Sequence, residues 1–247
     1  MLSQVTSVQT EIFRNFGYCH CCRKETQFYA QNEWLRDHYR CDNCQSIPRQ
    51  RHLHYVLDTF FSGWEQNIIH ESSPSNWFLA NIAGHYSSSF FISDLDPGLT
   101  RDGVRCENIE ALTFADASLD IFVTQDVLEH VFQPDKAIKE IHRVLKPGGF
   151  HIFTAPKHKG LLETRQRAAL KFDGTVDYLL SAEYHGNPID DGRSLVTWDY
   201  GYDFEVLLSE WAGSSVEVFH TRDRAKGIDA EFNEVFVIRK TRGQVAP

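Results

Sequence analysis

The sequence predicts an α/β fold, in which a mostly parallel sheet is covered by helices on both faces and follows a small four-cysteine zinc module. Strands and helices alternate from residue 49 onward, a pattern typical of parallel sheets. Two C-x-x-C pairs precede that point, and the hydrophobic fraction of 42% is ordinary for a globular protein. We therefore expect a zinc-ribbon-like module over residues 1–48 and a sheet domain over 49–247, with an insertion over 157–202.

The net charge of −9 disfavours a nucleic-acid partner, because phosphate binding needs a surplus of Lys and Arg. The start of the chain has no apolar run long enough for a signal peptide. No stretch reaches the roughly 18 apolar residues of a membrane helix, so no membrane contact is expected. The expected location is the cytoplasm, where cysteines serve as metal ligands, nucleophiles or core residues rather than disulfides.

Five of the six cysteines lie in the first 44 residues, where they read CHCC and CDNC. Cys19 with Cys22 and Cys41 with Cys44 form two C-x-x-C pairs separated by 18 residues, the spacing of a four-cysteine zinc site. Cys21 competes with Cys22, but the Cys19–Cys22 spacing repeats in the second pair. Four thiolates leave no open position, so the expected zinc is structural. Core cysteines or a redox pair are the alternatives.

Residues 11–54 hold seven Lys or Arg against five Asp or Glu, in contrast to the acidic chain as a whole. A local nucleic-acid patch is one explanation. A solvated face on a small zinc module is simpler, and it is the one we expect.

The first expected helix covers residues 48–64. Leu53, Val56 and Leu57 recur at helical spacing, and Gly63 ends the pattern.

The rest of the sheet domain continues the alternation. Strands are predicted from short apolar runs, and helices from longer stretches with one apolar face. The clearest helix carries Ala137, Ile138 and Ile141 on one face and stops at PGG. The predicted elements are a strand over 67–71, a helix over 75–86, strands over 89–94, 103–107 and 119–125, a helix over 134–145, a strand over 150–156, a helix over 203–213 and strands over 215–220 and 234–240.

Residues 157–202 interrupt this alternation with a polar and aromatic segment. Long irregular insertions in compact α/β domains are usually functional. Ligands of such sheets bind beyond the carboxyl ends of the strands, and the insertion leaves that edge directly after FTAP. We therefore expect it to form one side of a ligand pocket.

The run IEALTFADASLDIFVTQDVLEHVFQPDKAIKEIHRVLKPGGFHIFTAP resembles class I S-adenosylmethionine-dependent methyltransferases of the small-molecule type. Those chains carry several elements in the same order, of the form LPF, SFD, VLEHV and RVLKPGG. The resemblance covers residues 67–156 and continues more loosely to 240. It implies a Rossmann-like domain that binds S-adenosylmethionine, here behind a zinc-ribbon-like module.

The stretch HESSPSNW occupies the place of the family's glycine-rich cofactor loop. Glu71 ends the first strand, where the family often has an acidic residue that faces the ammonium of the cofactor. Ser72 and Ser73 stand where glycines are expected. Serine is small and its hydroxyl can donate to a carboxylate, although a loop without glycine does not easily adopt positive φ. Cofactor binding and a decayed, non-binding loop are the two interpretations, and we expect binding.

The resemblance also assigns the ribose and the adenine. In this family an acidic residue after the second strand accepts two hydrogen bonds from the ribose hydroxyls. Asp94, next to Leu95, holds that place, and Asp96 is a close rival. Asn108 and Ile109 stand where an acidic and a small apolar residue read the adenine.

Three further residues follow the fourth strand. Gln125 and Asp126 are expected to line the methionine end of the cofactor, and His130 lies in the E-H of the phrase. Glu129 and His130 could instead serve as helix-start and packing residues.

Methyl transfer requires little beyond alignment, because the sulfonium is already activated. A base is needed when the acceptor is a protonated hydroxyl or amine, and His185 is the predicted catalytic residue. It lies on a turn beside Gly186, Asn187 and Pro188, and a solvated surface histidine is the alternative. The predicted substrate residues, which could instead anchor the insertion, are His158, Tyr184, Trp198, Asp199 and Tyr200.

The predicted function is S-adenosylmethionine-dependent methyl transfer to a small-molecule or sugar-containing acceptor. A scaffold protein that keeps the fold without turnover is the alternative from another class, with the zinc module used for protein contact. An RNA or protein methyltransferase guided by the zinc module is a further alternative, which the acidic pI disfavours.

Overall fold

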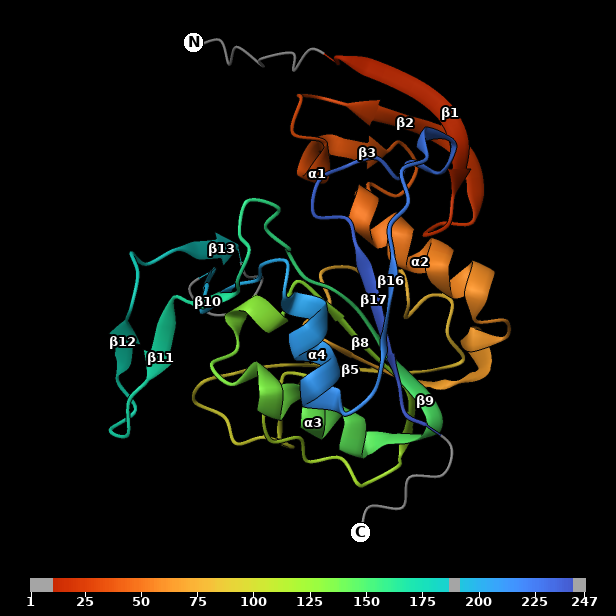
Figure 1. The fold of residues 1–247 in the computed structure, drawn as a ribbon. Coiled ribbons are helices and arrows are strands. Elements are labelled where there is room, and N and C mark those ends of the chain that lie inside the picture. The colour runs from red at the N-terminus through yellow and green to blue at the C-terminus, as the bar shows by residue number, and fades with distance from the viewer. Residues whose placement is uncertain (1–10, 187–191, 242–247) are drawn as a thin grey trace, which may run out of the picture.

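The computed structural model describes residues 11–186 and 192–241 and combines a small antiparallel sheet, a large central sheet and an insertion (Figure 1). Asn187 and Pro188, expected in the turn beside His185, lie outside the described residues. The helices are α1 (Leu35–His38), α2 (Pro48–Phe60), α3 (Pro134–Val144) and α4 (Phe204–Ala212), with 3-10 helices η1 (Trp64–Gln66), η2 (Leu128–His130) and η3 (Arg224–Lys226).

The N-terminal module is a three-stranded antiparallel sheet in the order β1 (Phe13–Cys19), β2 (Lys24–Ala30) and β3 (Tyr39–Cys41). Its small core joins Phe28, Ala30 and Tyr39 to the cysteines. A core of this size stabilises little by itself, so a bound metal would contribute much of the stability of the module.

The central sheet has eight strands in the order β16-β17-β9-β8-β4-β5-β7-β6. The five inner strands from β9 to β7 pair in parallel, whereas β17 runs antiparallel to β9, β16 to β17, and β6 to β7. This confirms the predicted mostly parallel, Rossmann-like sheet. The strands are β4 (Ile68–Ser72), β5 (His85–Phe90), β6 (Thr100–Arg101), β7 (Val104–Cys106), β8 (Leu119–Gln125), β9 (Leu145–Thr154), β16 (Val216–Phe219) and β17 (Val235–Arg239).

Helices cover both faces of this sheet, as predicted. Side chains alternate along β8, so Ile121 and Val123 join the cluster with α2, while Phe122 joins the cluster with α3 and α4. Both clusters are buried and apolar. The carboxyl ends of the inner strands are therefore supported by a packed core on both faces of the sheet.

The expected helix over 75–86 is wrong. The structure has bends and turns there, and β5 begins at His85, four residues earlier than the predicted strand. The side-chain oxygen of Asn76 accepts a hydrogen bond from the amide of Phe78 at 3.0 Å, which favours a turn over a helix. Leu79 is fully buried in the cluster that α2 forms, and Ile82 and Ala83 pack partly against the same cluster without forming a helix.

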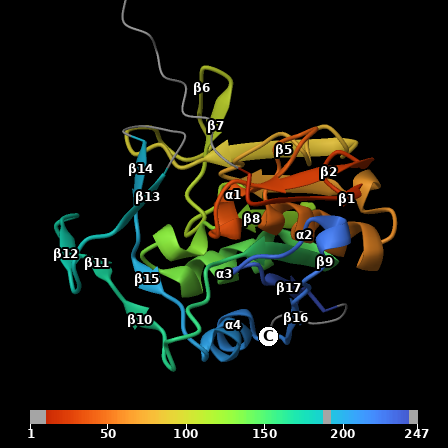
Figure 2. The same cartoon turned by 90° about the horizontal axis from the view of Figure 1, so that it is seen from above.

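The insertion is built from three short antiparallel pairs, which lie on the side of the molecule opposite α2 in Figures 1 and 2. The sequence predicted an irregular segment. The paired strands are β10 (Arg165–Gln166) with β15 (Trp198–Asp199), β11 (Ala168–Leu170) with β12 (Val176–Tyr178), and β13 (Tyr184–Gly186) with β14 (Arg193–Leu195).

Arg51 ties the N-terminal module to the sheet domain. Its guanidinium is fully buried and donates to the carbonyls of Tyr39 and Gly227, each at 2.8 Å, and to that of Ser46. These bonds join β3, the start of α2 and the loop before β17. None of the helices described is long and apolar enough to cross a membrane.

Candidate functional site

The four predicted zinc ligands converge in the N-terminal module. The sulfur atoms of Cys19, Cys22, Cys41 and Cys44 all lie within 4.8 Å of one another. Cys19 Sγ is 3.7 Å from Cys44 Sγ, and Cys22 Sγ is 4.0 Å from Cys41 Sγ. Four thiolates about 2.3 Å from one zinc ion in a tetrahedron would be about 3.8 Å apart, so the arrangement fits this metal. Cys21 is buried in the small core instead and is not part of the cluster.

A cavity of about 950 Å³ opens at the carboxyl ends of β4, β5, β7 and β8. This is the edge where the sequence placed the ligand. Of the predicted site residues, those that line it are Ser72, Ser73, Asn108, Ile109, Gln125, Asp126, His130 and His185.

The serine loop adopts the backbone that glycine would favour. Ser73 has φ of 54°, and its amide donates to Ser89 O at 2.7 Å. Asp126, after the fourth inner strand, also has φ of 54°. Such a conformation costs a non-glycine residue about 1 kcal/mol and is concentrated at functional sites. The absence of glycine therefore does not prevent the loop from turning around the cavity.

Glu71 lies behind the cavity wall. Its carboxylate accepts hydrogen bonds from Tyr86 Oη at 2.8 Å and from Gln125 Nε2 at 2.9 Å. Burial raises the pKa of Glu71 to about 7, and these two bonds only partly oppose the rise. Gln125 in turn lines the cavity, so Glu71 is one hydrogen bond away from a ligand.

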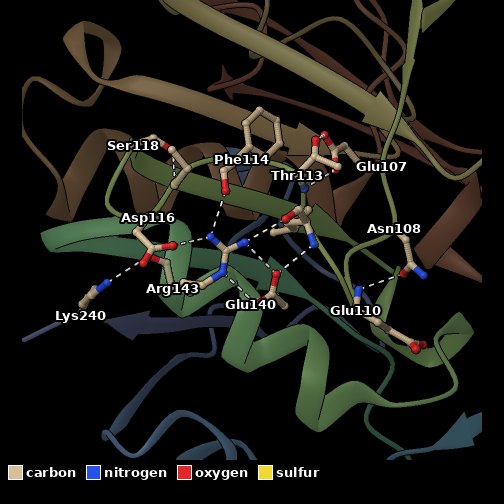
Figure 3. Close-up of polar contacts among 12 residues, drawn as sticks. Glu107, Asn108, Glu110, Thr113, Phe114, Asp116, Ser118, Glu140, Arg143 and Lys240 are labelled. Carbon is tan, nitrogen blue, oxygen red and sulfur yellow. Dashed lines mark hydrogen bonds and ion pairs between the residues drawn. The ribbon is translucent and has the colours of Figure 1, made fainter. Parts of the chain in front are cut away.

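Asn108, on the loop after β7, lines the cavity. Figure 3 shows the polar contacts of this loop. Asn108 Oδ1 accepts from the amide of Glu110 at 2.9 Å. Glu107, buried beside it, accepts from the amide of Thr113 at 2.9 Å. Arg143 of α3 donates to the carbonyl of Phe114 at 2.9 Å and holds the far end of the loop. The wall that carries Asn108 is thus fixed from both sides.

Asp94 and Leu95 do not line the described cavity. β5 ends at Phe90, and Asp94 lies on the following loop with its side chain 71% exposed and 2.9 Å from Arg101. Leu95 is half-buried, and its carbonyl accepts from the Cys106 thiol at 3.1 Å. Ser93, directly before Asp94, does line the cavity.

Two arginines from outside the predicted pocket line the cavity beside Asp126. Arg36 of α1 contacts Asp126, and Arg49 Nε of α2 lies 3.1 Å from the same carboxylate. Burial alone would raise the pKa of Asp126, but Arg49 and Arg36 outweigh it, so the pKa is lowered. The predicted solvated face is wrong for three of the seven basic residues in the stretch 11–54. Arg36 and Arg49 are largely buried, and Arg51 is fully buried. In the sequence, only the surplus of basic residues in this stretch pointed to a role for these arginines.

The other side of the cavity is built from η2 and β13. His130 donates from Nδ1 to Leu195 O at 2.9 Å, and its ring lies 5.1 Å from the ring of His185. Burial lowers the pKa of His130 to about 4 and also lowers that of His185. Burial raises the pKa of Glu129, which lies between them, well above its ordinary value. Sequence reasoning treated Glu129 only as a packing residue.

The remaining predicted substrate residues make structural contacts in or beside the insertion, outside the described cavity lining. Trp198 Nε1 donates to Phe132 O at 3.3 Å, and the fully buried Tyr200 donates to Leu128 O at 2.7 Å. Asp199 accepts from Arg165 and Arg167, each at 2.8 Å. His158 Nε2 lies 3.9 Å from the same Asp199 carboxylate, and the side chain of Tyr184 lies on the surface next to Arg193.

Comparison with known proteins points to one kind of domain. Residues 83–153 match the family model of a methyltransferase domain. A dimethylglycine N-methyltransferase of Parasynechococcus marenigrum is 38% identical over 64 residues, which are 26% of this chain and 23% of that protein. A ubiquinone/menaquinone biosynthesis C-methyltransferase of Hydrogenovibrio crunogenus is 50% identical over 42 residues, 17% of this chain and 16% of that one. The matched stretches thus span less than a quarter of these relatives.

Solved structures resemble the chain at low sequence identity. The 1,6-didemethyltoxoflavin N1-methyltransferase of Burkholderia thailandensis covers 78% of each chain at 12% identity, with a TM-score of 0.48. The family match falls on the strands and loops from β5 to β9 that surround much of the cavity. By its sequence, the part of this chain from residue 83 to residue 153 is similar to a methyltransferase domain.

Proposed function

We propose that the protein transfers a methyl group from S-adenosylmethionine to a small-molecule or sugar-containing acceptor. The carrying observation is the cavity at the carboxyl ends of the inner strands, which is lined in part by residues of the methyltransferase match. Ligand cavities usually enclose about 300–1,000 Å³, so one near the upper limit has room for a cofactor and a small acceptor together. The names of the relatives, an N- and a C-methyltransferase, support a small acceptor.

The cofactor would lie along the β4, β5 and β7 loops. Glu71, Ser72 and Ser73 would hold its methionine end, and Asn108 and Ile109 its adenine. The two serines and the Asn108–Ile109 pair line the cavity. Glu71 lies behind the wall, hydrogen-bonded to Gln125, and its carboxylate can pair with an ammonium group.

Asp94 is proposed as the ribose ligand. Its neighbour Ser93 already lines the cavity, so contact requires only that the Asp94 carboxylate exchange the exposed Arg101 for the ribose hydroxyls. An exposed ion pair is worth about 0–1 kcal/mol, so this exchange is inexpensive.

Gln125, Asp126 and His130 would line the methionine end, next to Arg36 and Arg49. The zinc of the N-terminal module would then be structural, and the module would supply part of the pocket wall through Arg36. Protein contact through its outer face is compatible with this role.

The chemistry needs an acceptor atom in line with the sulfonium at about 3–3.5 Å. We propose that the insertion provides this side of the pocket and that loss of the acceptor proton depends on His185. The support is its position, because His185 lines the cavity next to His130. A histidine whose pKa is lowered is neutral near pH 7 and keeps a lone pair.

Calorimetry with S-adenosylmethionine and S-adenosylhomocysteine tests the proposal, followed by transfer of a labelled methyl group to amine, phenol and sugar-nucleotide acceptors. Saturable binding of one cofactor per chain is expected. Asn108→Ala should weaken it about tenfold, the effect of one lost hydrogen bond. Asn81→Ala is the matched control, because Asn81 is exposed on a turn outside the cavity lining.

Absence of cofactor binding by the zinc-loaded protein would refute the proposal. Binding without transfer to any acceptor would favour the scaffold alternative. RNA binding that falls steeply with salt would favour the RNA methyltransferase.

A further inference from the structure

Glu129 is a buried carboxyl group without a hydrogen-bonding partner in the described protein. Its side chain is fully buried, and neither carboxylate oxygen has a hydrogen-bond donor among the described residues. Such a group costs several kcal/mol unless something satisfies it. Its backbone is held in place, because Thr197 donates to Glu129 O through both its amide and its hydroxyl, at 2.7 and 3.0 Å.

The imidazole rings of two histidines lie about 4 Å from this carboxyl group. Glu129 Oε1 lies 3.8 Å from His130 Nε2 and 4.0 Å from His185 Nδ1. Both gaps are too long for a direct hydrogen bond. They suit two ligands of one ion, since atoms about 2.1 Å from the same metal can be up to about 4.2 Å apart. All three ligand atoms lie within 4.8 Å of one another, and the half-exposed His185 can close the remaining gap by a small ring rotation.

The second nitrogen of each ring also lies near an acceptor, at hydrogen-bonding distance for His130 and just beyond it for His185. His130 Nδ1 donates to Leu195 O, because a carbonyl can only accept, so His130 Nε2 carries the lone pair that faces Glu129. His185 Nε2 lies 3.7 Å from Glu183 Oε1. Metal-ligating histidines typically direct their other ring nitrogen to a carbonyl or carboxylate in this way.

We propose that Glu129, His130 and His185 bind a divalent transition-metal ion at the acceptor side of the cavity. One carboxylate and two imidazoles suit zinc, iron, cobalt or nickel rather than magnesium or calcium, which prefer oxygen ligands. Three protein ligands leave open positions, in contrast to the closed set of four cysteines. His130 and His185 line the cavity, so the open positions face the bound acceptor.

The role of the ion rests on the proposed methyl transfer. An acceptor hydroxyl bound to the ion is more acidic than a free one and loses its proton to solvent water. The oxygen then uses an electron pair to form the new O–C bond, while the S–C bond breaks and its electron pair returns to sulfur. His185 would act as a metal ligand in this step. The acceptor would accordingly bind the ion through an oxygen atom. That oxygen would be either the atom that is methylated or a neighbour of that atom.

Cobalt(II) added to the zinc-loaded protein tests the site by absorption spectroscopy, with zinc and cobalt counted by elemental analysis. One cobalt ion per chain should bind beyond the zinc, with the weak bands of nitrogen and oxygen ligands and without thiolate charge-transfer bands. Glu129→Gln and His185→Ala should each weaken cobalt binding at least about tenfold while the zinc content stays the same. His220→Ala is the control, because His220 is an exposed histidine 3.7 Å from Glu234 and is not among the residues that line the cavity.

The outcomes are distinct. No cobalt beyond the cysteine site, or binding that both Glu129→Gln and His185→Ala leave unchanged, would overturn the metal site. If Glu129→Gln does not fold, His185→Ala decides, because its side chain is half-buried and can be removed at small cost. Cofactor binding without cobalt binding would leave the proposed function standing and remove only this inference. Cobalt binding without cofactor binding would leave the metal site standing and remove the proposed function.

Discussion

Glu71 gives the protein a pH-dependent stability that can be calculated from its surroundings. Burial raises its pKa from an ordinary 4.5 to about 7. The folded state therefore binds more protons than the unfolded state between these two values, and stability falls as the pH rises through this window. The full loss is about 3 kcal/mol, because a tenfold change in proton affinity is worth about 1.4 kcal/mol.

Glu71→Gln isolates this contribution. The substitution keeps the shape and cannot ionise. Tyr86 can still donate to the new amide oxygen. Gln125 Oε1 has no protein hydrogen-bond partner among the described residues, so a flip of the Gln125 amide lets it accept from the new amide nitrogen. The variant should therefore fold with its hydrogen bonds intact.

Urea unfolding of both proteins at about pH 5 and about pH 8.5 measures the effect. The wild type should lose about 2.5 kcal/mol more than Glu71→Gln over this range, since most of the window lies within it. The comparison at each pH cancels the other titrating groups, including the cysteines. Equal losses in the two proteins would show that Glu71 is not held protonated by burial and would refute the reasoning.

Cofactor binding gives an independent measurement of the same group. If the Glu71 carboxylate pairs with the ammonium of S-adenosylmethionine, its ionisation favours binding. The dissociation constant of the wild type should then fall by about tenfold or more as the pH rises past 7, the value of one charge-assisted hydrogen bond. Glu71→Gln should bind weakly and without this pH dependence. A pH-independent wild-type affinity would separate Glu71 from the ammonium.

The remaining predictions concern single substitutions. Cys41→Ser should lose the roughly one zinc per chain that elemental analysis should find in the wild type, and Cys21→Ser should keep it; the opposite result would exchange their roles. Asp94→Ala should weaken cofactor binding by about 1.5–3 kcal/mol in calorimetry, and an unchanged constant in a folded variant would remove the ribose assignment. Arg36→Ala should lower the free energy of unfolding by about 1.5–3 kcal/mol, because it removes a hydrogen bond to a buried charge; unchanged stability would argue against that pair. His185→Ala should lower turnover at least about tenfold and leave cofactor affinity almost unchanged, whereas normal turnover would contradict its proposed role.

Hydrophobic periodicity correctly predicted the elements that have a clear apolar face or an unbroken apolar run. The amphipathic helix that became α3 and the apolar strand that became β8 are both present as expected, because one apolar face or run can be buried in only one way against a sheet. The stretch from residue 75 to residue 84 has similar periodicity but forms bends and turns. Its buried residue Leu79 joins the cluster that α2 forms, a long-range contact that a local pattern cannot foresee.

By itself, the sequence determined the cysteine cluster, the mostly parallel sheet and the edge at which the cavity opens, because each depends on short spacings and on the order of elements along the chain. Only the tertiary structure brought Arg36 against Asp126, 90 residues away, and His185 against Glu129. It also placed Trp198, Asp199 and Tyr200 in structural contacts and left Asp94 on an exposed loop. Contacts of this kind depend on which surfaces meet when the module, the sheet and the insertion pack together, and no local spacing encodes that.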